Sequence, residues 1–240
     1  LGGGITPNQS AAMDRGILRA RGNLKRAAAL DIAPNSVRIT NLTGHKLISG
    51  YPEGRRMWLH TVWKNESGTV LREDGSYGSF TTTVNGTNYT VSSITDPNAR
   101  IYQAKMGMTQ DWALQLLGLG VSPVLPLSFD RVTGAPTLTL IQLASAAPGT
   151  VHETFHFVLN NKLMADNRIP PYGFDYNEAQ TRNALPVPAS QFGNPGANGT
   201  YQHFDDVPLT PPNGATRAEV ELMYQTASWE YIQFLRLANP

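Results

Sequence analysis

The sequence predicts a mainly β protein, a β-sandwich with an N-terminal and a C-terminal helix packed against it. Short stretches in which apolar and polar residues alternate, such as 37–40 and 57–63, recur through the middle of the chain. They are separated by clusters of Gly, Pro, Asn and Asp. Helical spacing of apolar residues is instead concentrated near the two termini. Many short strands divided by turns are typical of a sandwich, so we expect one structural domain of this class.

The first predicted element is a helix from Ser10 to Leu30. Apolar side chains recur there at three- and four-residue intervals, whereas Arg and Lys occupy the other faces. Ser10 is placed to cap this helix, and the segment 31–35 (Asp-Ile-Ala-Pro-Asn) is placed to end it. We therefore assign 1–35 to the N-terminal helix and a junction.

Predicted strands follow through the segment 36–228, which we assign to the β-sandwich domain. The residues at 65–68, Asn-Glu-Ser-Gly, have the composition of a hairpin turn. The strands are expected at 37–40, 57–63, 69–72, 80–84, 89–92, 100–104, 138–143, 152–159 and 218–224.

Two helices and one long loop are expected in the second half of the chain. A short helix is predicted at 111–117, closed by Gly118. The segment 170–212 is rich in Pro, Gly, Asn and Tyr, which indicates a long ordered loop. A helix over 228–237 then closes the chain, and 229–240 forms the predicted C-terminal segment.

Composition excludes several classes of function. The net charge is +1 and only 15% of residues are charged, so neither a nucleic acid nor an anionic membrane is an expected partner. No apolar run of about 18 residues occurs, which excludes a predicted membrane span. The chain has no cysteine, so it cannot form disulfides or attach haem c through a Cys-x-x-Cys-His run. Neither a phosphate-binding Gly-rich loop nor a Gly-x-Ser-x-Gly motif is present, and no catalytic residue is predicted.

The segment 40–59 is the most informative part of the chain. It reads TNLTGHKLISGYPEGRRMWL and places one His, one Lys, one Glu and two Arg in a connector between two predicted strands. Such side chains are costly to bury unless they pair with each other or with a partner. The segment is therefore either a solvated loop, an internally paired loop or a contact surface.

This segment resembles the opening of the C-terminal, haem-free β-rich domain of exported multihaem c-type cytochromes, where the wording is TN.TGHKLPTGYPEGRRMWL. The segment 166–174, DNRIPPYGF, resembles the DNRIPP.GF segment of that family, and 221–235, ELMYQTASWEYIQFL, resembles its closing LYYQTASKEYIEFL segment. The residues at 1–4, LGGG, are similar to the junction that follows the haem-bearing part. Two features depart from the family pattern: Ile48-Ser49 stands where Pro-Thr is usual, and cysteine is absent.

The resemblance implies an extracellular or periplasmic protein whose haem c is carried by an upstream segment or a partner chain. It also implies that the chain is either a processed fragment or a haem-free paralogue. Its first implied function is a non-catalytic structural or docking domain of a multihaem electron-transfer system, with assembly into a homo-oligomer or filament as one form of partnership. A second is a domain that supplies a distal haem ligand or propionate contacts to a redox enzyme. A third hypothesis is a carbohydrate- or surface-binding β-sandwich without a redox role.

Three residues of the first motif are candidates for contact with haem in trans. His45 lies in a Gly-bounded turn from which an imidazole could reach a neighbouring haem. Arg55 and Arg56 carry guanidinium groups that suit bidentate binding of a haem propionate. The alternative for His45 is a hydrogen bond to the backbone of its turn, and for the two arginines it is a salt bridge to Glu53.

Candidate metal ligands lie in the second motif. Asp166, Asn167 and Asp175 supply oxygen ligands of the kind that Ca²⁺ prefers, although their spacing matches no regular calcium loop. The alternative is that these residues cap turns. His152 and His156 are four residues apart on a predicted strand, a separation of about 13 Å, which is too far for one shared ion.

Overall fold

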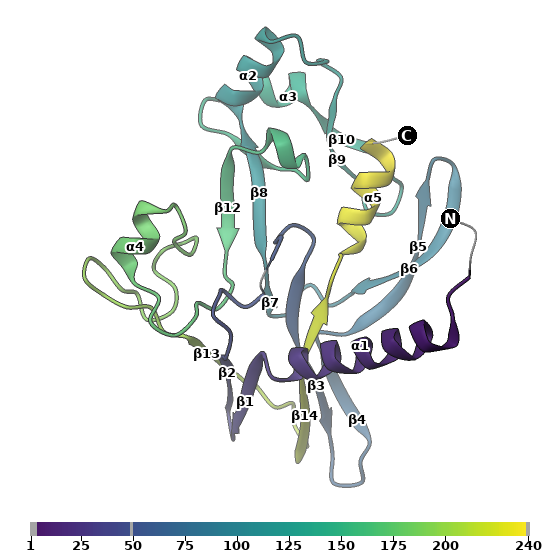
Figure 1. Cartoon of the computed structure of the whole chain (residues 1–240), viewed down its shortest axis with the longest axis vertical. Coiled ribbons are helices and arrows are strands. Elements are labelled where there is room, and N and C mark those ends of the chain that lie inside the picture. Colours follow the sequence, from purple (N-terminus) through teal and green to yellow (C-terminus); the bar gives the residue numbers. More distant parts are fainter. Residues whose placement is uncertain (1–3, 49, 239–240) are drawn as a thin grey trace.

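Antiparallel strands build the body of the protein in the computed structural model, which describes residues 4–48 and 50–238 (Figure 1). A helix lies at each end of the described chain, α1 (Pro7–Lys25) and α5 (Trp229–Ala238). The predicted mainly β fold with terminal helices is therefore confirmed. Residues 1–3, 49 and 239–240 are outside the described residues, so parts of the predicted junction, first motif and C-terminal segment fall there.

Strand β3 (Arg56–Lys64) forms the centre of a four-stranded sheet. It pairs along its whole length with β14 (Arg217–Gln225), and its other edge pairs with β4 (Val70–Asp74) and β7 (Ile101–Tyr102). Consecutive side chains of a strand point to opposite faces. Because Met57, Trp58 and Leu59 are nevertheless all buried, both faces of this strand are covered.

A second sheet shares its core with the first. Its order is β1 (Ala28–Ala33), β2 (Ser36–Asn41) and β13 (Phe204–Pro208). Val37 and Ile39 of β2 belong to the same hydrophobic cluster as Met57 and Leu59 of β3. Two antiparallel sheets packed on one apolar core form the sandwich-like part of the fold.

A second hydrophobic cluster lies in the part of the molecule drawn at the top of Figure 1. Met108, Leu127, Leu140 and Leu143 form its centre. The elements of this part are β8 (Ala104–Thr109), α2 (Gln110–Gly118), β9 (Pro126–Phe129), β10 (Pro136–Thr139), α3 (Leu140–Ala144), β11 (Val151–Glu153) and β12 (Lys162–Asp166).

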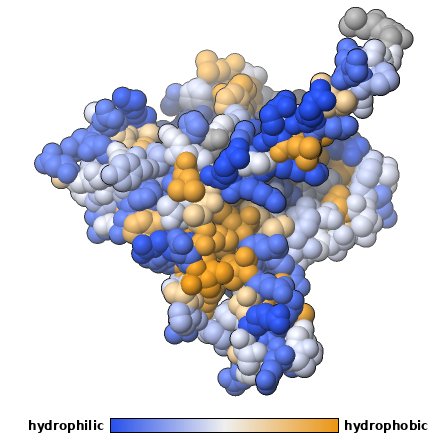
Figure 2. Space-filling view, turned by 60° about the horizontal axis from the view of Figure 1, so that its bottom comes forward, coloured by the Kyte–Doolittle hydropathy of each residue, from blue (hydrophilic) through white to orange (hydrophobic). Residues whose placement is uncertain are grey.

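The C-terminal helix packs against the body as predicted. Helix α5 contacts β9 and the hairpin of β5 (Tyr77–Val84) and β6 (Thr87–Ile94), and it buries Trp229 and Phe234. The N-terminal helix lies against the body less closely: none of the residues of α1 is buried, and Leu24 near its end lines a pocket with Leu222 and Tyr224. Its apolar residues Met13, Ile17 and Leu24 remain about half exposed, at 56%, 50% and 52%. Figure 2 shows this hydrophobic surface on α1 and beside it.

The predicted bounds of α1 are wrong at both ends. Thr6, rather than Ser10, caps the helix, because its side chain accepts from the backbone of Gln9 while the Gln9 side chain accepts from the backbone of Thr6. The helix ends at Lys25, and the residues from Ala28 to Ala33 form β1 instead. This strand pairs with β2 in a hairpin, so the predicted boundary at residue 35 falls in a turn within one sheet.

Three other predicted segments are corrected by the structure. The segment 138–143 leaves the strand at Thr139, which forms a capping box with Gln142 and begins α3. The segment 152–159 is a strand only as far as Glu153 and ends in a 3₁₀ turn over Phe157–Leu159. The predicted loop 170–212 contains α4 (Tyr176–Thr181) and β13. Each helix found in residues 4–48 and 50–238 is too short or too polar to span a bilayer.

We expect the amides of α1 to exchange with solvent about 100-fold or more faster than those of α5. A helix of 19 residues without a buried face is stabilised by little more than its own propensity, and Gly16 and Gly22 weaken it further. Hydrogen–deuterium exchange of the full chain, followed by mass spectrometry, measures this directly. Equal protection of α1 and α5 would show that α1 is packed after all.

Candidate functional site

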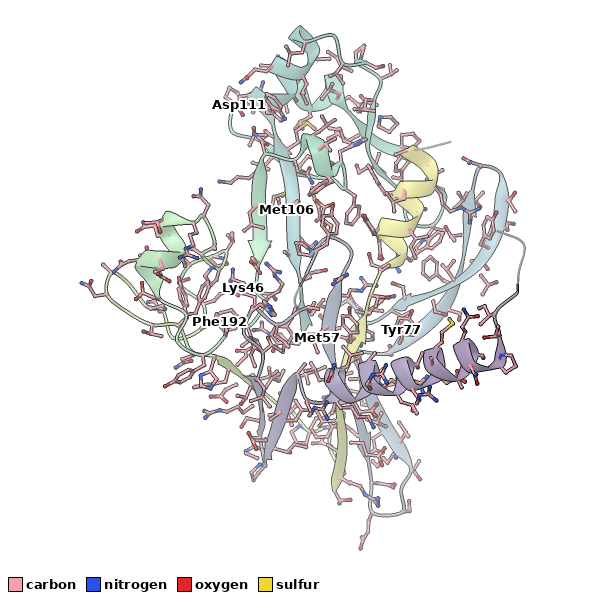
Figure 3. The ribbon with its side chains drawn as sticks, viewed as in Figure 1. Lys46, Met57, Tyr77, Met106, Asp111 and Phe192 are labelled. Atoms are coloured by element: carbon pink, nitrogen blue, oxygen red, sulfur yellow. The ribbon has the colours of Figure 1, made fainter. Side chains whose placement is uncertain are left out.

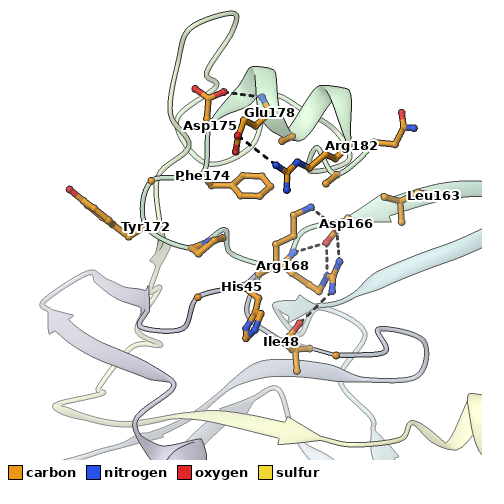
Figure 4. Close-up of a pocket in the computed structure, with 18 residues that line it drawn as sticks. His45, Ile48, Leu163, Asp166, Arg168, Tyr172, Phe174, Asp175, Glu178 and Arg182 are labelled. Atoms are coloured by element: carbon orange, nitrogen blue, oxygen red, sulfur yellow. Dashed lines mark hydrogen bonds and ion pairs between the residues drawn. The ribbon is translucent and has the colours of Figure 1, made fainter.

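A cleft of about 570 Å³ brings together two of the segments singled out in the sequence. Its walls come from the loop around Gly44–Lys46, from the chain between Asp166 and Asp175, and from α4 (Figure 4). Figure 3 shows Lys46 near the end of β12. Residues some 120 positions apart in the sequence therefore form a single site.

Asn41 shapes the loop that carries His45. Its side chain is buried, and its amide nitrogen donates to the backbone carbonyls of His45 at 2.7 Å and of Ile169 at 2.9 Å. Its amide oxygen accepts from both the backbone N–H and the hydroxyl of Thr43, each at 2.8 Å. All four hydrogen bonds available to an Asn side chain are thus made. The loop is tied to the second motif at its far end too, because Leu47 N–H donates to the Ile169 carbonyl at 2.9 Å.

A buried carboxylate with two cationic partners forms the floor of the cleft (Figure 4). The Asp166 side chain is 1% exposed, and its Oδ2 accepts from Lys46 Nζ at 2.7 Å. Arg168 donates to both oxygens of the same carboxylate, from Nε at 2.8 Å and from Nη2 at 2.9 Å. Burial alone raises the pKa of Asp166, but the hydrogen bonds and charges of Arg168 and Lys46 outweigh it and hold that pKa below its usual value.

The wall opposite this floor is aromatic and helical. The Phe174 ring lies 5.5 Å from Lys46 Nζ, in a cation–π arrangement. Asp175 caps α4 by accepting from the backbone N–H of Glu178 at 2.9 Å. Arg182 and Glu178 form an exposed ion pair at 3.6 Å on the rim. This wall and its rim therefore carry one positive and two negative charges, whereas the floor carries two positive charges and one negative charge.

His45 lies on the rim with its imidazole exposed. Its ring points away from Phe174 in Figure 4. The described residues supply no hydrogen-bond partner for the imidazole, and only the backbone of His45 bonds within the turn. The turn is therefore held without the ring, which leaves the ring nitrogens available to a partner.

The structure does not bring Arg55 and Arg56 to this cleft. Arg56 is buried, and its guanidinium donates to Gln225 at 2.7 Å and to Ser93 at 2.8 Å, with Glu230 3.5 Å away. Burial lowers the pKa of Arg56. Arg55 lines a separate, mostly apolar pocket of about 240 Å³ together with Leu24 and Met57. Of the three predicted haem-contact residues, only His45 therefore lines the cleft.

The predicted calcium ligands all have protein partners. The Asp166 carboxylate is held by two cations, and Asp175 caps a helix. The Asn167 side chain accepts from Gln103 N–H and donates to the Ile101 carbonyl. Within 4–48 and 50–238, no three His, Asp or Glu side chains are grouped so that they could hold a metal ion. Calcium binding here stays a prediction that would require these contacts to rearrange.

Sequence reasoning missed Lys46, Arg168, Phe174 and Arg182 as residues of the cleft. The signal for Arg168 was its place directly after Asp166-Asn167, since Asp and Arg two positions apart outside a helix can form a bidentate pair. No local signal linked Lys46 to Asp166.

No family model, curated protein or solved structure matches this chain.

Acid should remove the contribution of the Asp166 cluster to stability. Because the folded pKa of Asp166 is lowered, the carboxylate contributes stability above its unfolded pKa of about 4, and this contribution is lost as the pH falls through the folded pKa. We expect the difference in unfolding free energy between the native protein and Asp166→Asn to shrink below about pH 4. Urea unfolding at a series of pH values measures this difference, and a constant difference would contradict the assignment.

Proposed function

We propose that this chain is a non-catalytic docking domain of an extracytoplasmic multihaem c-type cytochrome system, with the haem carried by another segment or chain. The observation that carries the proposal is the ion pair of Lys46 with Asp166, because it joins two motif segments that resemble the cytochrome family into one open cleft. The resemblance of these segments names the partner class. The hydrogen bonds and ion pairs that join the walls of the cleft suit a surface that receives a partner without rearranging.

The rim of the cleft is the expected contact surface. Tyr172 is 83% exposed, and its ring lies edge-on to that of His203 at 5.2 Å. Exposed Tyr and Arg side chains are enriched at protein interfaces, and Arg182 stands on the same rim. An aromatic side chain this exposed gains little stabilisation from burial in the isolated chain, whereas a bound partner would bury it.

Photo-crosslinking in the organism that produces the protein tests this proposal. A photoreactive phenylalanine analogue at the position of Tyr172 should yield a crosslinked product that stains for covalently attached haem. The same analogue at Val158, which is 84% exposed and lies outside the cleft, serves as the control and should yield no such product. A crosslinked product without haem, or haem staining that is equal at both positions, would contradict the proposal.

The exposed imidazole of His45 favours a second candidate function, the supply of a distal haem ligand. A neutral imidazole nitrogen without a protein partner can enter an open axial position of a haem iron. We expect the native protein to shift the Soret band of an N-acetylated haem undecapeptide, which carries one open axial site, and His45→Ala to abolish this shift.

His60→Ala is the matched control, because His60 lies in β3 and bonds to Glu73 at 2.9 Å. It should shift the band as the native protein does. An identical Soret spectrum with native protein and His45→Ala would exclude ligation by His45 and leave the docking function untouched.

A further inference from the structure

The floor of the cleft carries one positive charge more than its partners neutralise. Lys46 and Arg168 both pair with the single carboxylate of Asp166, and their side chains are only 9% and 15% exposed. Of the other acidic groups that line the cleft, Asp175 accepts from the backbone N–H of Glu178, and Glu178 pairs with Arg182 on the rim. A buried surplus charge is costly unless an opposite charge joins it.

The hydrogen-bond donors of Lys46 point to the same need. An ammonium group has three donors. Across the described part of the chain, the one acceptor bonded to Lys46 Nζ is Asp166 Oδ2 at 2.7 Å. The centroid of the Phe174 ring lies 5.5 Å from the same nitrogen. Burial lowers the pKa of Lys46, as expected for an ammonium that is incompletely solvated.

Arg168 uses more of its hydrogen-bond donors than Lys46 does. Two of its nitrogens donate to Asp166, and Nη1 donates to the Ile48 carbonyl at 3.4 Å. Arg168 is therefore held in place by three hydrogen bonds, whereas Lys46 has hydrogen-bond donors that Asp166 leaves unused. An incoming anion could therefore take up these unused donors of Lys46.

We infer that the cleft binds a carboxylate borne on a planar apolar body, with the carboxylate on Lys46 and the body against Phe174. The volume of about 570 Å³ falls within the usual range for small-molecule sites. The Phe174 ring supplies a flat apolar wall beside the ammonium, and Arg182, which pairs with Glu178 at 3.6 Å, lies on the rim. Such a carboxylate could belong to a free aromatic acid or to the propionate of a haem on a docked partner, and only the haem source rests on the proposed function.

Calorimetric titration of the full chain with 2-naphthoate, and with 2-naphthamide as its uncharged match, tests the inference at pH 7. Naphthoate should bind at least tenfold more tightly than the amide. Lys46→Met should weaken naphthoate binding at least tenfold, and it should leave the fold intact because Asp166 and Arg168 still form a neutral, bidentate pair.

Two further variants complete the test. Lys64→Met is the matched control, since Lys64 pairs with Glu219 at 2.7 Å on β3 and β14, outside the cleft, and it should bind naphthoate as the native protein does. Arg182→Gln changes only the exposed rim and should weaken binding severalfold, which keeps the test informative if Lys46→Met fails to fold. Equal affinity for naphthoate and its amide, affinity unchanged by both cleft variants, or no naphthoate binding at millimolar concentration would overturn the inference.

The haem undecapeptide separates the two sources of the carboxylate. Binding that is lost when its two propionates are methyl-esterified, measured with His45→Ala to remove ligation, would identify a haem propionate as a ligand. Naphthoate binding without haem staining in the crosslinking experiment would support a free acid, so the carboxylate site would stand while the docking function failed.

Discussion

Replacing Asp166 with Asn is expected to lower the free energy of unfolding by about 3–5 kcal/mol. The amide is nearly isosteric with the carboxylate, so the change removes charge and leaves the shape. It also leaves Lys46 and Arg168 facing each other in a buried site without a counter-charge. Urea unfolding followed by fluorescence or circular dichroism measures the loss.

Asp206→Asn is the control for this substitution. Asp206 accepts two hydrogen bonds from Arg38, each at 2.7 Å, in the same bidentate way that Asp166 accepts from Arg168. Because both partners of that pair are about half exposed, water replaces the lost interaction and the effect should be far smaller. A similar loss of unfolding free energy in both variants would show that burial does not determine how much the Asp166 cluster contributes to stability.

Replacing Asn41 with Ala is expected to lower the free energy of unfolding by about 2–4 kcal/mol, because four hydrogen bonds of one buried side chain disappear together. The carbonyls of His45 and Ile169 would lose their Asn41 donor. The loop that carries His45 should also become more mobile, so any binding at the cleft should weaken more than stability alone explains. Chemical unfolding and amide exchange of residues 42–47 measure the two effects.

Asn65→Ala tests whether this result is specific to a buried Asn. Asn65 Oδ1 also bonds within a turn, to the backbone of Thr69 and the hydroxyl of Ser67, but that turn is exposed. Asn65→Ala should lower the free energy of unfolding by no more than about 1 kcal/mol, since water can hydrogen-bond to the freed groups. A loss for Asn41→Ala no larger than this would mean that the loop is held by other contacts.

The sequence alone was sufficient for the fold class and for elements with a long, regular period. The strand at 218–224 and the helix at 111–117 appear in the structure with bounds shifted by one residue at each end. The hairpin turn at 65–68 was equally predictable, because Asn and Gly meet its conformational demands locally.

The local sequence pattern predicted the wrong conformation where a short segment is compatible with both a helix and a strand. The apolar residues 27–30 continue the helical spacing of α1, but pairing with β2 makes 28–33 a strand. The alternation at 138–143 indicates a strand, yet the capping box of Thr139 and Gln142 starts a helix inside it. In both cases a hydrogen-bond partner decided the conformation, and in the first case that partner lies in another strand.

The amino-acid sequence by itself determined the mainly β class, the terminal helices and the absence of thiol chemistry, because these follow from periodicity and from residue types. Only the tertiary structure decided which charged residues meet. Asp166 pairs with Lys46 across 120 positions, Arg56 is enclosed by Gln225 and Ser93, and His45 is left exposed. Ion pairs and hydrogen bonds act over a few ångströms of space, so distance along the chain carries no record of them until the strands are packed.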